Sequence, residues 1–147
     1  MKVEALNQKD KDNWAKLYHG YAEFYEMKMN QDILDTVWLW IHSPEVKFYS
    51  IGVKSSENAL IGFMHYREMP SPLRGKLVGF LDDLFVHPDF RGTGAVQLLF
   101  NELKLQAKKN DWPYVRWITA TDNSRARKVY NQISKPIDFV TYQMQIN

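Results

Sequence analysis

The sequence predicts an α/β fold in which a mixed sheet carries helices on both of its faces. A nearly continuous apolar run from Gly79 to Val86 indicates a strand that is covered on both sides. After a short turn with two glycines, apolar residues recur at helical spacing from Val96 to Ala107. The chain as a whole reads as β-α-α-β-β-β-α-β-α-β, so antiparallel strands come first and strand–helix crossovers follow. This order predicts a central mixed sheet of six to seven strands.

Length and composition are those of one ordinary globular domain, and we expect residues 1–147 to form a single domain. The net charge of +2 is too small to indicate nucleic-acid binding. Because the chain has no cysteine, it has no disulfide, no thiolate metal site and no cysteine nucleophile, and we expect no metal. The sequence contains no apolar run of about 18 residues and no signal-peptide core, which favours a cytoplasmic protein.

The first half of the chain is expected to form a strand, two helices and a hairpin. Val3–Leu6 is typical of a short strand, and the polar residues after it can cap a helix. The first helix has an unusually aromatic stripe, formed by Trp14, Leu17, Tyr18, Tyr21, Phe24 and Tyr25. The second helix has its apolar face from Ile33 to Ile41. Lys47–Val53 and Leu60–Glu68 indicate the two strands of the hairpin.

The second half is expected to alternate strands and helices. Met69–Gly75 contains two prolines and reads as a loop before the strand Lys76–Val86. Beyond the long helix, Tyr114–Thr119 indicates another buried strand. Asn123 is a suitable N-cap for a last helix, and the alternating pattern of Ile137–Ile146 predicts a final strand.

The turn Arg91-Gly92-Thr93-Gly94 opens a helix directly after a strand. Unpaired backbone N–H groups and the positive end of the helix dipole meet at such a place and favour a phosphate. The spacing does not fit the dinucleotide fingerprint, and the Gly-Lys-Ser/Thr of a P-loop is absent. The two common nucleotide-binding interpretations are therefore excluded.

Together with its flanks, this turn resembles the central motif of the GNAT superfamily of acyl-CoA-dependent N-acetyltransferases. The string Leu84-Phe85-Val86-His87-Pro88 matches the family's apolar-x-Val-x-Pro strand end, and Arg91-Gly92-Thr93-Gly94-Ala95-Val96 matches its Arg/Gln-x-x-Gly-x-Gly/Ala turn, with Val96 at the last small position. The stretch from Asn123 to Tyr130 resembles the family's last helix, although Ser134-Lys135 replaces the Gly-aromatic pair that often closes it. The likeness in element order extends over essentially the whole chain.

This resemblance implies that the chain binds acetyl-CoA between two splayed parallel strands. The glycine turn would bind the pyrophosphate through backbone N–H groups, and the strand end and Asn123 would contact the pantetheine arm. The residues implied for this site are Leu84, Phe85, Val86, Arg91, Gly92, Thr93, Gly94, Ala95, Val96 and Asn123.

Catalysis by such an enzyme needs a proton acceptor and a proton donor. The resemblance implies that Tyr130 is the general acid, which protonates the departing thiolate. Asp82 and Asp83 are candidate bases because they interrupt an apolar strand, and regular alternation sends them to opposite faces unless a bulge intervenes. Glu26 and His65 are weaker candidates that would act through water, and His65 is also typical of a half-buried strand residue.

The acceptor pocket is expected near the end of the aromatic helix, at Tyr21, Tyr25 and Glu26, because aromatic rings and carboxylates suit a cationic amine. This segment resembles the fungal-type histone-and-other-protein acetyltransferases and their bacterial relatives. That subgroup implies a small basic amine, an amino acid or a protein lysine as acceptor, and a homodimer built partly from the C-terminal strand. The alternative is a non-catalytic GNAT-like module that binds CoA or a protein.

Overall fold

The computed structural model describes residues 1–147, and its internal contacts divide the chain into two compact units. The first unit is Met1–Trp117 and the second is Ile118–Asn147. No helix in either unit is both long enough and apolar enough to cross a lipid bilayer.

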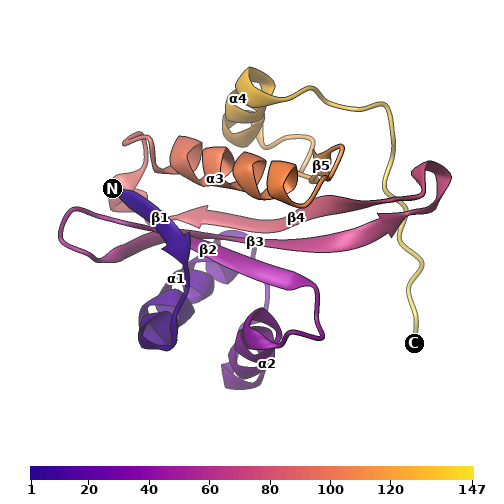
Figure 1. Ribbon diagram of the computed structural model, residues 1–147. Helices are drawn as coiled ribbons and strands as arrows, with labels where there is room; N and C mark the ends of the chain where they lie inside the picture. Colours follow the sequence, from indigo (N-terminus) through magenta and orange to yellow (C-terminus); the bar gives the residue numbers. More distant parts are fainter. The chain divides into compact units, whose positions relative to one another are not determined.

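The first unit is built on a five-stranded sheet with the strand order β1-β2-β3-β4-β5 (Figure 1). The strands are β1 (Lys2–Ala5), β2 (Phe48–Lys54), β3 (Leu60–Ser71), β4 (Lys76–Val86) and β5 (Val115–Arg116). The first three pairs of neighbours are antiparallel, and β5 is parallel to β4. The predicted mixed sheet is confirmed, whereas the prediction of six to seven strands is wrong.

The β3–β4 hairpin is longer than the sequence predicts. Met69–Gly75 was expected as a loop, but β3 continues through Pro70 to Ser71 and pairs with β4 as far as Lys76. A proline is tolerated there because it lies near the end of the ladder. Gly75 closes the hairpin at a positive φ of 61°, a backbone conformation that glycine adopts without a steric cost.

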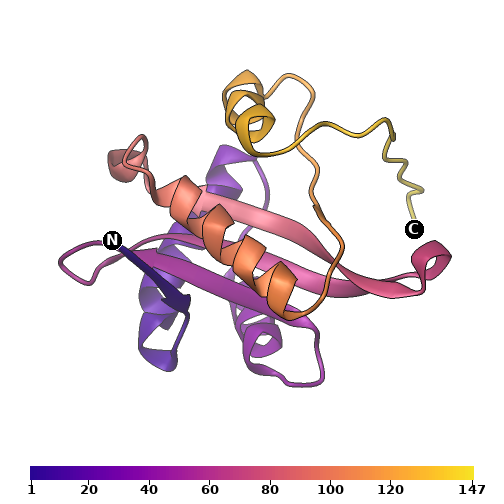
Figure 2. The same ribbon diagram turned by 45° about the horizontal axis from the view of Figure 1, so that its top comes forward.

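Helices cover both faces of the sheet, as the sequence predicts. α1 (Lys11–Phe24) and α2 (Gln31–His42) lie on one face, and α3 (Ala95–Lys109) lies on the other (Figures 1 and 2). The core under α1 and α2 is made of Leu6, Trp14, Leu17, Leu34, Val37, Trp38, Leu60, Phe63 and Phe85. Burying this many large apolar side chains is the main stabilising contribution on that face.

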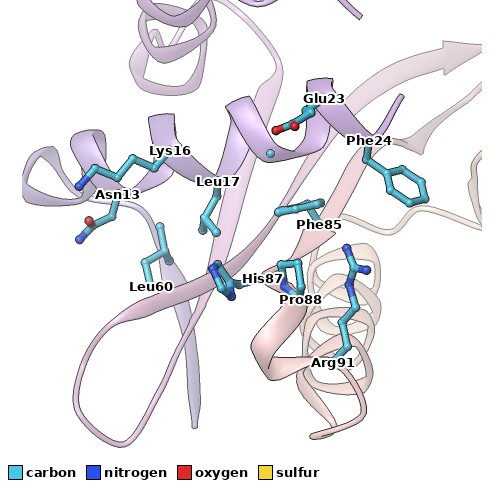
Figure 3. Close-up of a pocket in the computed structure, with 11 residues that line it drawn as sticks. Asn13, Lys16, Leu17, Glu23, Phe24, Leu60, Phe85, His87, Pro88 and Arg91 are labelled. Atoms are coloured by element: carbon cyan, nitrogen blue, oxygen red, sulfur yellow. The ribbon is translucent and has the colours of Figure 1, made fainter. Parts of the chain in front are cut away.

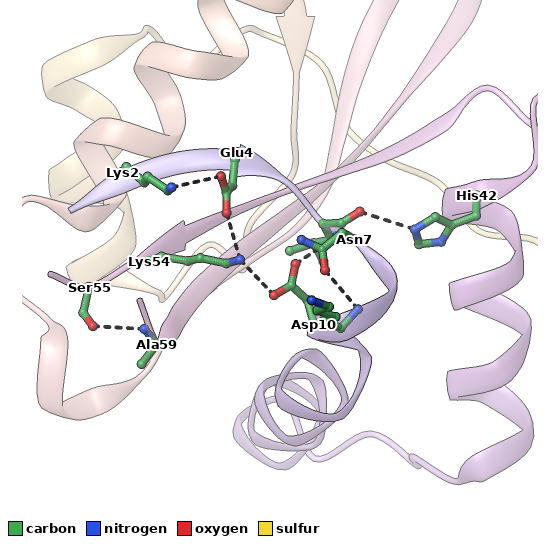
Figure 4. Close-up of polar contacts among 10 residues, drawn as sticks. Lys2, Glu4, Asn7, Asp10, His42, Lys54, Ser55 and Ala59 are labelled. Atoms are coloured by element: carbon green, nitrogen blue, oxygen red, sulfur yellow. Dashed lines mark hydrogen bonds and ion pairs between the residues drawn. The ribbon is translucent and has the colours of Figure 1, made fainter. Parts of the chain in front are cut away.

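A buried lysine ties β1 and the start of α1 to β2 (Figure 4). The Lys54 ammonium contacts Glu4 Oε1 at 2.8 Å and Asp10 Oδ1 at 3.0 Å, and only 6% of its side chain is exposed. Asp10 also accepts a hydrogen bond from the Asn7 backbone at 2.9 Å, as part of a capping box. The hydrogen bond and charge of Glu4 raise the pKa of Lys54 and keep it protonated in spite of burial.

The second unit contains one helix, α4 (Ser124–Ile133), and no strand. Asn123 caps this helix, since its side chain accepts a hydrogen bond from the Ala126 backbone N–H at 3.3 Å. The strand predicted at Ile137–Ile146 is wrong, and β5 is much shorter than the predicted Tyr114–Thr119. Alternation of apolar residues favours a strand, but a strand also needs a hydrogen-bonded neighbour, and residues 137–146 belong to no ladder.

Candidate active site

The turn between β4 and α3 has the backbone of an anion-binding loop. Gly92 and Gly94 have φ angles of 77° and 90°, and no atom lies within 4 Å of the position that a Cβ would take on either residue. Gly94 is the N-cap of α3, and no side chain caps the helix there. The first N–H groups of α3 therefore have no partner from a capping side chain and are available to an anion.

The C-terminal half of β4 directs backbone groups away from β3. The His87 N–H donates a hydrogen bond to the Ile61 carbonyl of β3 at 2.8 Å. Because backbone groups of successive residues point to alternate edges of a strand, the N–H and C=O groups of Val86 and Leu84 point to the edge of β4 on which β5 lies. The ladder with β5 covers only the pairs Gly79–Val115 and Phe80–Arg116 and ends before Leu84. These backbone groups are consequently beyond the last pair of the parallel ladder, as the predicted pantetheine site requires.

A β-bulge in β4 places both adjacent aspartates on the same face of the sheet. In the register with β3, Asp83 lies opposite His65 and Leu81 lies opposite Tyr66, so Asp82 is the additional residue. Asp83 contacts His65 and Asp82 contacts Arg67, and both partners lie on the β3 face that packs against α1 and α2. Of the two arrangements left open by the sequence, the regular one with opposite faces does not occur, and the bulge, which adds one residue, is found.

Asp83 is a half-buried carboxylate that accepts hydrogen bonds from several donors. Its Oδ2 accepts hydrogen bonds from Tyr18 Oη and His65 Nδ1, both at 2.8 Å. Burial raises the pKa of Asp83, but the hydrogen bond and electrostatic attraction of the His65 ring, together with hydrogen bonds from Tyr18 and Tyr21, outweigh it and hold the pKa below the ordinary value. Burial and the Asp83 charge in turn raise the pKa of Tyr18 and Tyr21, so both hydroxyls remain donors.

Asp82, next to it in the chain, is in the opposite electrostatic situation. Its Oδ1 accepts one hydrogen bond from Arg67 Nη2 at 2.8 Å, and its buried Oδ2 has no partner. Burial raises the pKa of Asp82, Arg67 counteracts this, and the negative charge of Asp83 raises it further, for a net upward shift. The two carboxylates thus have pKa values shifted in opposite directions, which is the pattern of a functional pair.

The aromatic residues predicted for the acceptor pocket lie at the C-terminal end of α1. The ring of Tyr21 contacts Phe85 edge to face at 6.3 Å and Tyr25 at 4.8 Å. The charge of Asp83 acts on both hydroxyls, so Tyr21 and Tyr25 lie close to that carboxylate. Glu26 follows α1 at a φ of 54° and is exposed. The structure therefore brings two of the three predicted acceptor residues near the aspartates.

A cavity of about 580 Å³ lies between α1 and the C-terminal end of β4 (Figure 3). Lys16, Gly20 and Glu23 of α1 line one wall, and Phe85 and Arg91 line the other. A Cβ at Gly20 would lie 3.1 Å from the ring of Phe85, so glycine allows α1 to approach β4 closely. The Arg91 guanidinium lies 5.7 Å from the centre of the Phe85 ring, which brings the start of the glycine turn to this cavity.

Tyr130 and Asn123, the remaining predicted site residues, belong to the second unit. Tyr130 is half-buried in α4, and its carbonyl accepts the N–H of Ser134 at 2.9 Å at the end of the helix. Asn123 uses its side-chain oxygen for the helix cap. Their roles at acetyl-CoA stay predictions.

The sequence places Trp14 only on the aromatic stripe of the first helix and makes His65 a weaker candidate base. In the structure, Trp14 Nε1 donates a hydrogen bond to His65 Nε2 at 2.9 Å, and neither residue is exposed. The only indication of this contact in the sequence is chemical: a buried indole N–H needs a hydrogen-bond acceptor. No local pattern connects two residues that are 51 positions apart.

Comparisons with known proteins agree with this geometry. A model of the acetyltransferase (GNAT) family matches residues 14–133. A D-amino-acid N-acetyltransferase from Saccharomyces cerevisiae is 27% identical over 142 residues, which are 96% of this chain and 88% of the yeast protein. Among solved structures, a probable acetyltransferase superimposes with a TM-score of 0.87 at 25% identity, over 100% of this chain and 99% of its own. A ribosomal-protein-alanine N-acetyltransferase from Brucella melitensis biovar Abortus 2308 shares the fold, with a TM-score of 0.81 at 22% identity over 99% and 100% of the two chains.

Proposed function

This chain belongs to the acetyltransferase (GNAT) family, and from that premise we propose that it acetylates a primary amine by direct attack on acetyl-CoA in a ternary complex. It is an acetyl-CoA-dependent N-acetyltransferase. The observation that carries the proposed mechanism is the pair of adjacent carboxylates, Asp82 and Asp83, on one face of a bulged strand. Their pKa values are shifted in opposite directions, so each has its own role.

The acetyl-CoA site extends from the glycine turn along the C-terminal half of β4. Backbone N–H groups from Arg91 to Val96 bind the pyrophosphate, and the positive φ angles of Gly92 and Gly94 support this assignment. The backbone groups of Leu84 and Val86 bond the pantetheine arm as an additional strand would. This site leaves the α1 face of β4 to the acceptor amine.

Asp82 is the general base of the reaction. Acetyl-CoA supplies a thioester, whose C–S bond breaks as the C–N bond to the acceptor nitrogen forms. Asp82 takes the proton that this nitrogen loses, directly or through one water molecule. A raised pKa makes Asp82 the better proton acceptor of the pair, while Asp83 stays ionised and strengthens it by its negative charge.

Tyr130 is the general acid and gives its hydroxyl proton to the departing sulfur. The phenol pKa of about 10 and the thiol pKa of about 8.5 are close enough for transfer along a hydrogen bond. Asn123 contacts the pantetheine arm. Both residues lie within residues 14–133, the part of the chain that the acetyltransferase (GNAT) family model matches, which supports the two assignments.

The acceptor is a small basic amine, an amino acid or a protein lysine, which binds near Tyr21, Tyr25 and Glu26. Aromatic rings next to an ionised carboxylate favour a cationic amine, and the D-amino-acid N-acetyltransferase relative supports an amino acid. We further propose a homodimer, which light scattering tests by comparison with the 17.4 kDa mass of one chain.

Two measurements test this function with the same protein preparation. Isothermal titration with acetyl-CoA should give saturable binding in the micromolar range. Release of the CoA thiol should then be followed over D- and L-amino acids, polyamines, aminoglycosides and a lysine peptide. Thiol release with at least one class supports the proposal, and its absence with every class, or no binding at high micromolar acetyl-CoA, overturns it.

A further inference from the structure

A chain of hydrogen bonds leads from α1 through two buried rings to the half-buried carboxylate of Asp83. Trp14 Nε1 lies 2.9 Å from His65 Nε2, and His65 Nδ1 lies 2.8 Å from Asp83 Oδ2. Trp14 and His65 have no exposed surface. The Trp14 and His65 rings lie 5.9 Å apart and come from α1 and β3. Two rigid elements of the first unit therefore fix the position of the imidazole.

The direction of these hydrogen bonds determines the charge of the imidazole. An indole N–H can only donate, so His65 Nε2 must be an acceptor and cannot hold a proton. The ring proton is then on Nδ1, which donates it to Asp83, and this tautomer is neutral. A second proton on Nε2 would place two N–H groups head to head at 2.9 Å in a place without solvent.

We propose that Trp14 and His65 are positioning residues that keep the negative charge of Asp83 uncancelled beside Asp82. Were His65 protonated, it would form an ion pair with Asp83 and remove most of the field that Asp83 exerts on its neighbour. Trp14 prevents this by occupying the second ring nitrogen. The inference rests on the proposed function in one respect, because it takes Asp82 as the base that the field acts upon.

The other groups around Asp83 do not supply the missing positive charge. From α1, Tyr18, Tyr21 and Tyr25 face it with neutral hydroxyls. From β4 it has Asp82, whose own partner is Arg67 of β3. On the β2 side of His65 lie the ring of Phe48 and, in register, Ser50, neither of which titrates. The neutral state of His65 therefore decides whether Asp83 remains an uncompensated anion.

The first test compares Trp14→Phe with Trp38→Phe through the pH dependence of kcat/KM. Trp38 is a matched control, because it is buried in the same core, its ring lies 4.9 Å from that of Trp14, and its Nε1 bonds to Gln8 instead of to the imidazole. In Trp14→Phe the freed Nε2 can take a proton, Asp82 becomes less basic, and the acid limb should move to lower pH by roughly half a unit to one unit. Trp38→Phe should not move it. Superimposable profiles of the two variants overturn the proposal.

Repeating the Trp14→Phe substitution in a His65→Asn protein separates a change in the protonation of His65 from a loss of packing. In His65→Asn the amide NH₂ can replace the Nδ1–H donor to Asp83, but no ring nitrogen remains to be protonated. His65→Asn should therefore retain the acid limb of the wild type, and Trp14→Phe should no longer move it in this background. A shift of the same size in both backgrounds shows a packing effect and overturns the proposal.

The third measurement needs neither turnover nor a variant. Long-range ¹H–¹⁵N spectra of the wild type report the protonation of each ring nitrogen of His65. We expect the signature of an unprotonated Nε2 from pH 5 to pH 8, whatever the acceptor or the activity. A second proton appearing on the His65 ring above pH 5 overturns the proposal. Failure of the proposed function appears instead as a lack of thiol release with the His65 spectrum unchanged, so the two failures are distinguishable.

Discussion

Replacing Asp82 by asparagine tests the assignment of the general base most directly. The amide oxygen of Asp82→Asn can still accept the 2.8 Å hydrogen bond from Arg67, so the local geometry is retained while the proton acceptor is lost. General-base catalysis typically contributes a factor of about 10²–10⁴. We therefore expect kcat to fall by about 10²–10⁴, which corresponds to roughly 3–5 kcal/mol of transition-state stabilisation. The Kd of acetyl-CoA should change less than about twofold, because the predicted site uses the glycine turn and backbone groups on the β5 edge of β4, and not the Asp82 side chain.

Asp82→Asn should be more stable than the wild type at pH 7, although its kcat is lower. Burial raises the pKa of Asp82, so its ionised form is disfavoured in the folded protein. For such a group the stabilising contribution is present at low pH and is lost as the pH rises through the raised folded-state value. At pH 7 the wild type therefore has an unfavourable charge that Asp82→Asn lacks, and urea denaturation should show a higher free energy of unfolding for the variant.

The assay is steady-state release of the CoA thiol at saturating acetyl-CoA, together with isothermal titration for the affinity. Asp111→Asn is a matched control, because Asp111 is 95% exposed and its positive φ suits asparagine. The control should keep wild-type kcat. If Asp82→Asn retains more than about a third of wild-type kcat, Asp82 is not the base, and if its stability falls at pH 7, the argument from burial is wrong.

Four further substitutions test other parts of the structure. Between pH 7 and pH 3, Asp83→Asn should lose less unfolding free energy than the wild type in urea titrations. The lowered pKa of Asp83 stabilises the folded wild type above the ordinary aspartate pKa, and this contribution is lost as the pH falls through the folded-state pKa. Equal losses in the two proteins would contradict this. Tyr130→Phe should lower kcat by about 10²-fold or more with little change in acetyl-CoA affinity, and equal activity would remove Tyr130 from the mechanism. Gly94→Ala should weaken acetyl-CoA binding about tenfold by calorimetry, since a side chain at a φ of 90° strains the turn by ~1–2 kcal/mol. Gly75→Ala should leave the binding unchanged, because it introduces a similar strain at the hairpin and not at the turn. Lys54→Met should lower the free energy of unfolding in urea by ~3 kcal/mol, because it leaves the half-buried Glu4 and the buried Asp10 without their cation. A decrease below about 1 kcal/mol would refute that reasoning.

Local patterns in the sequence were sufficient for most of the fold. The apolar run before Val86, the glycine turn at Arg91–Gly94 and the periodic helix after it predicted β4, the turn and α3. These features follow from neighbouring residues, because alternation, helical periodicity and glycine conformations are local properties of the chain. The same motif led to the family, which the match over residues 14–133 confirms.

The number of strands could not be obtained in this way. Ile137–Ile146 alternates as a strand should, yet strand formation depends on hydrogen bonds to a neighbour that may lie anywhere in the sequence. The same reason explains β5, where Tyr114–Thr119 is apolar enough for a strand but pairs with β4 only at Val115 and Arg116.

The chemistry of the site was likewise decided by tertiary structure. The sequence identified Asp82 and Asp83 as unusual, but the bulge that turns both to one face depends on the register between β3 and β4. The opposite pKa shifts of the two carboxylates come partly from partners distant in the chain, Tyr18 and His65 for Asp83 and Arg67 for Asp82. The sequence by itself thus determined the fold family and the candidate residues for the chemistry, whereas pairing and burial, which are non-local, determined the charge and orientation of those residues.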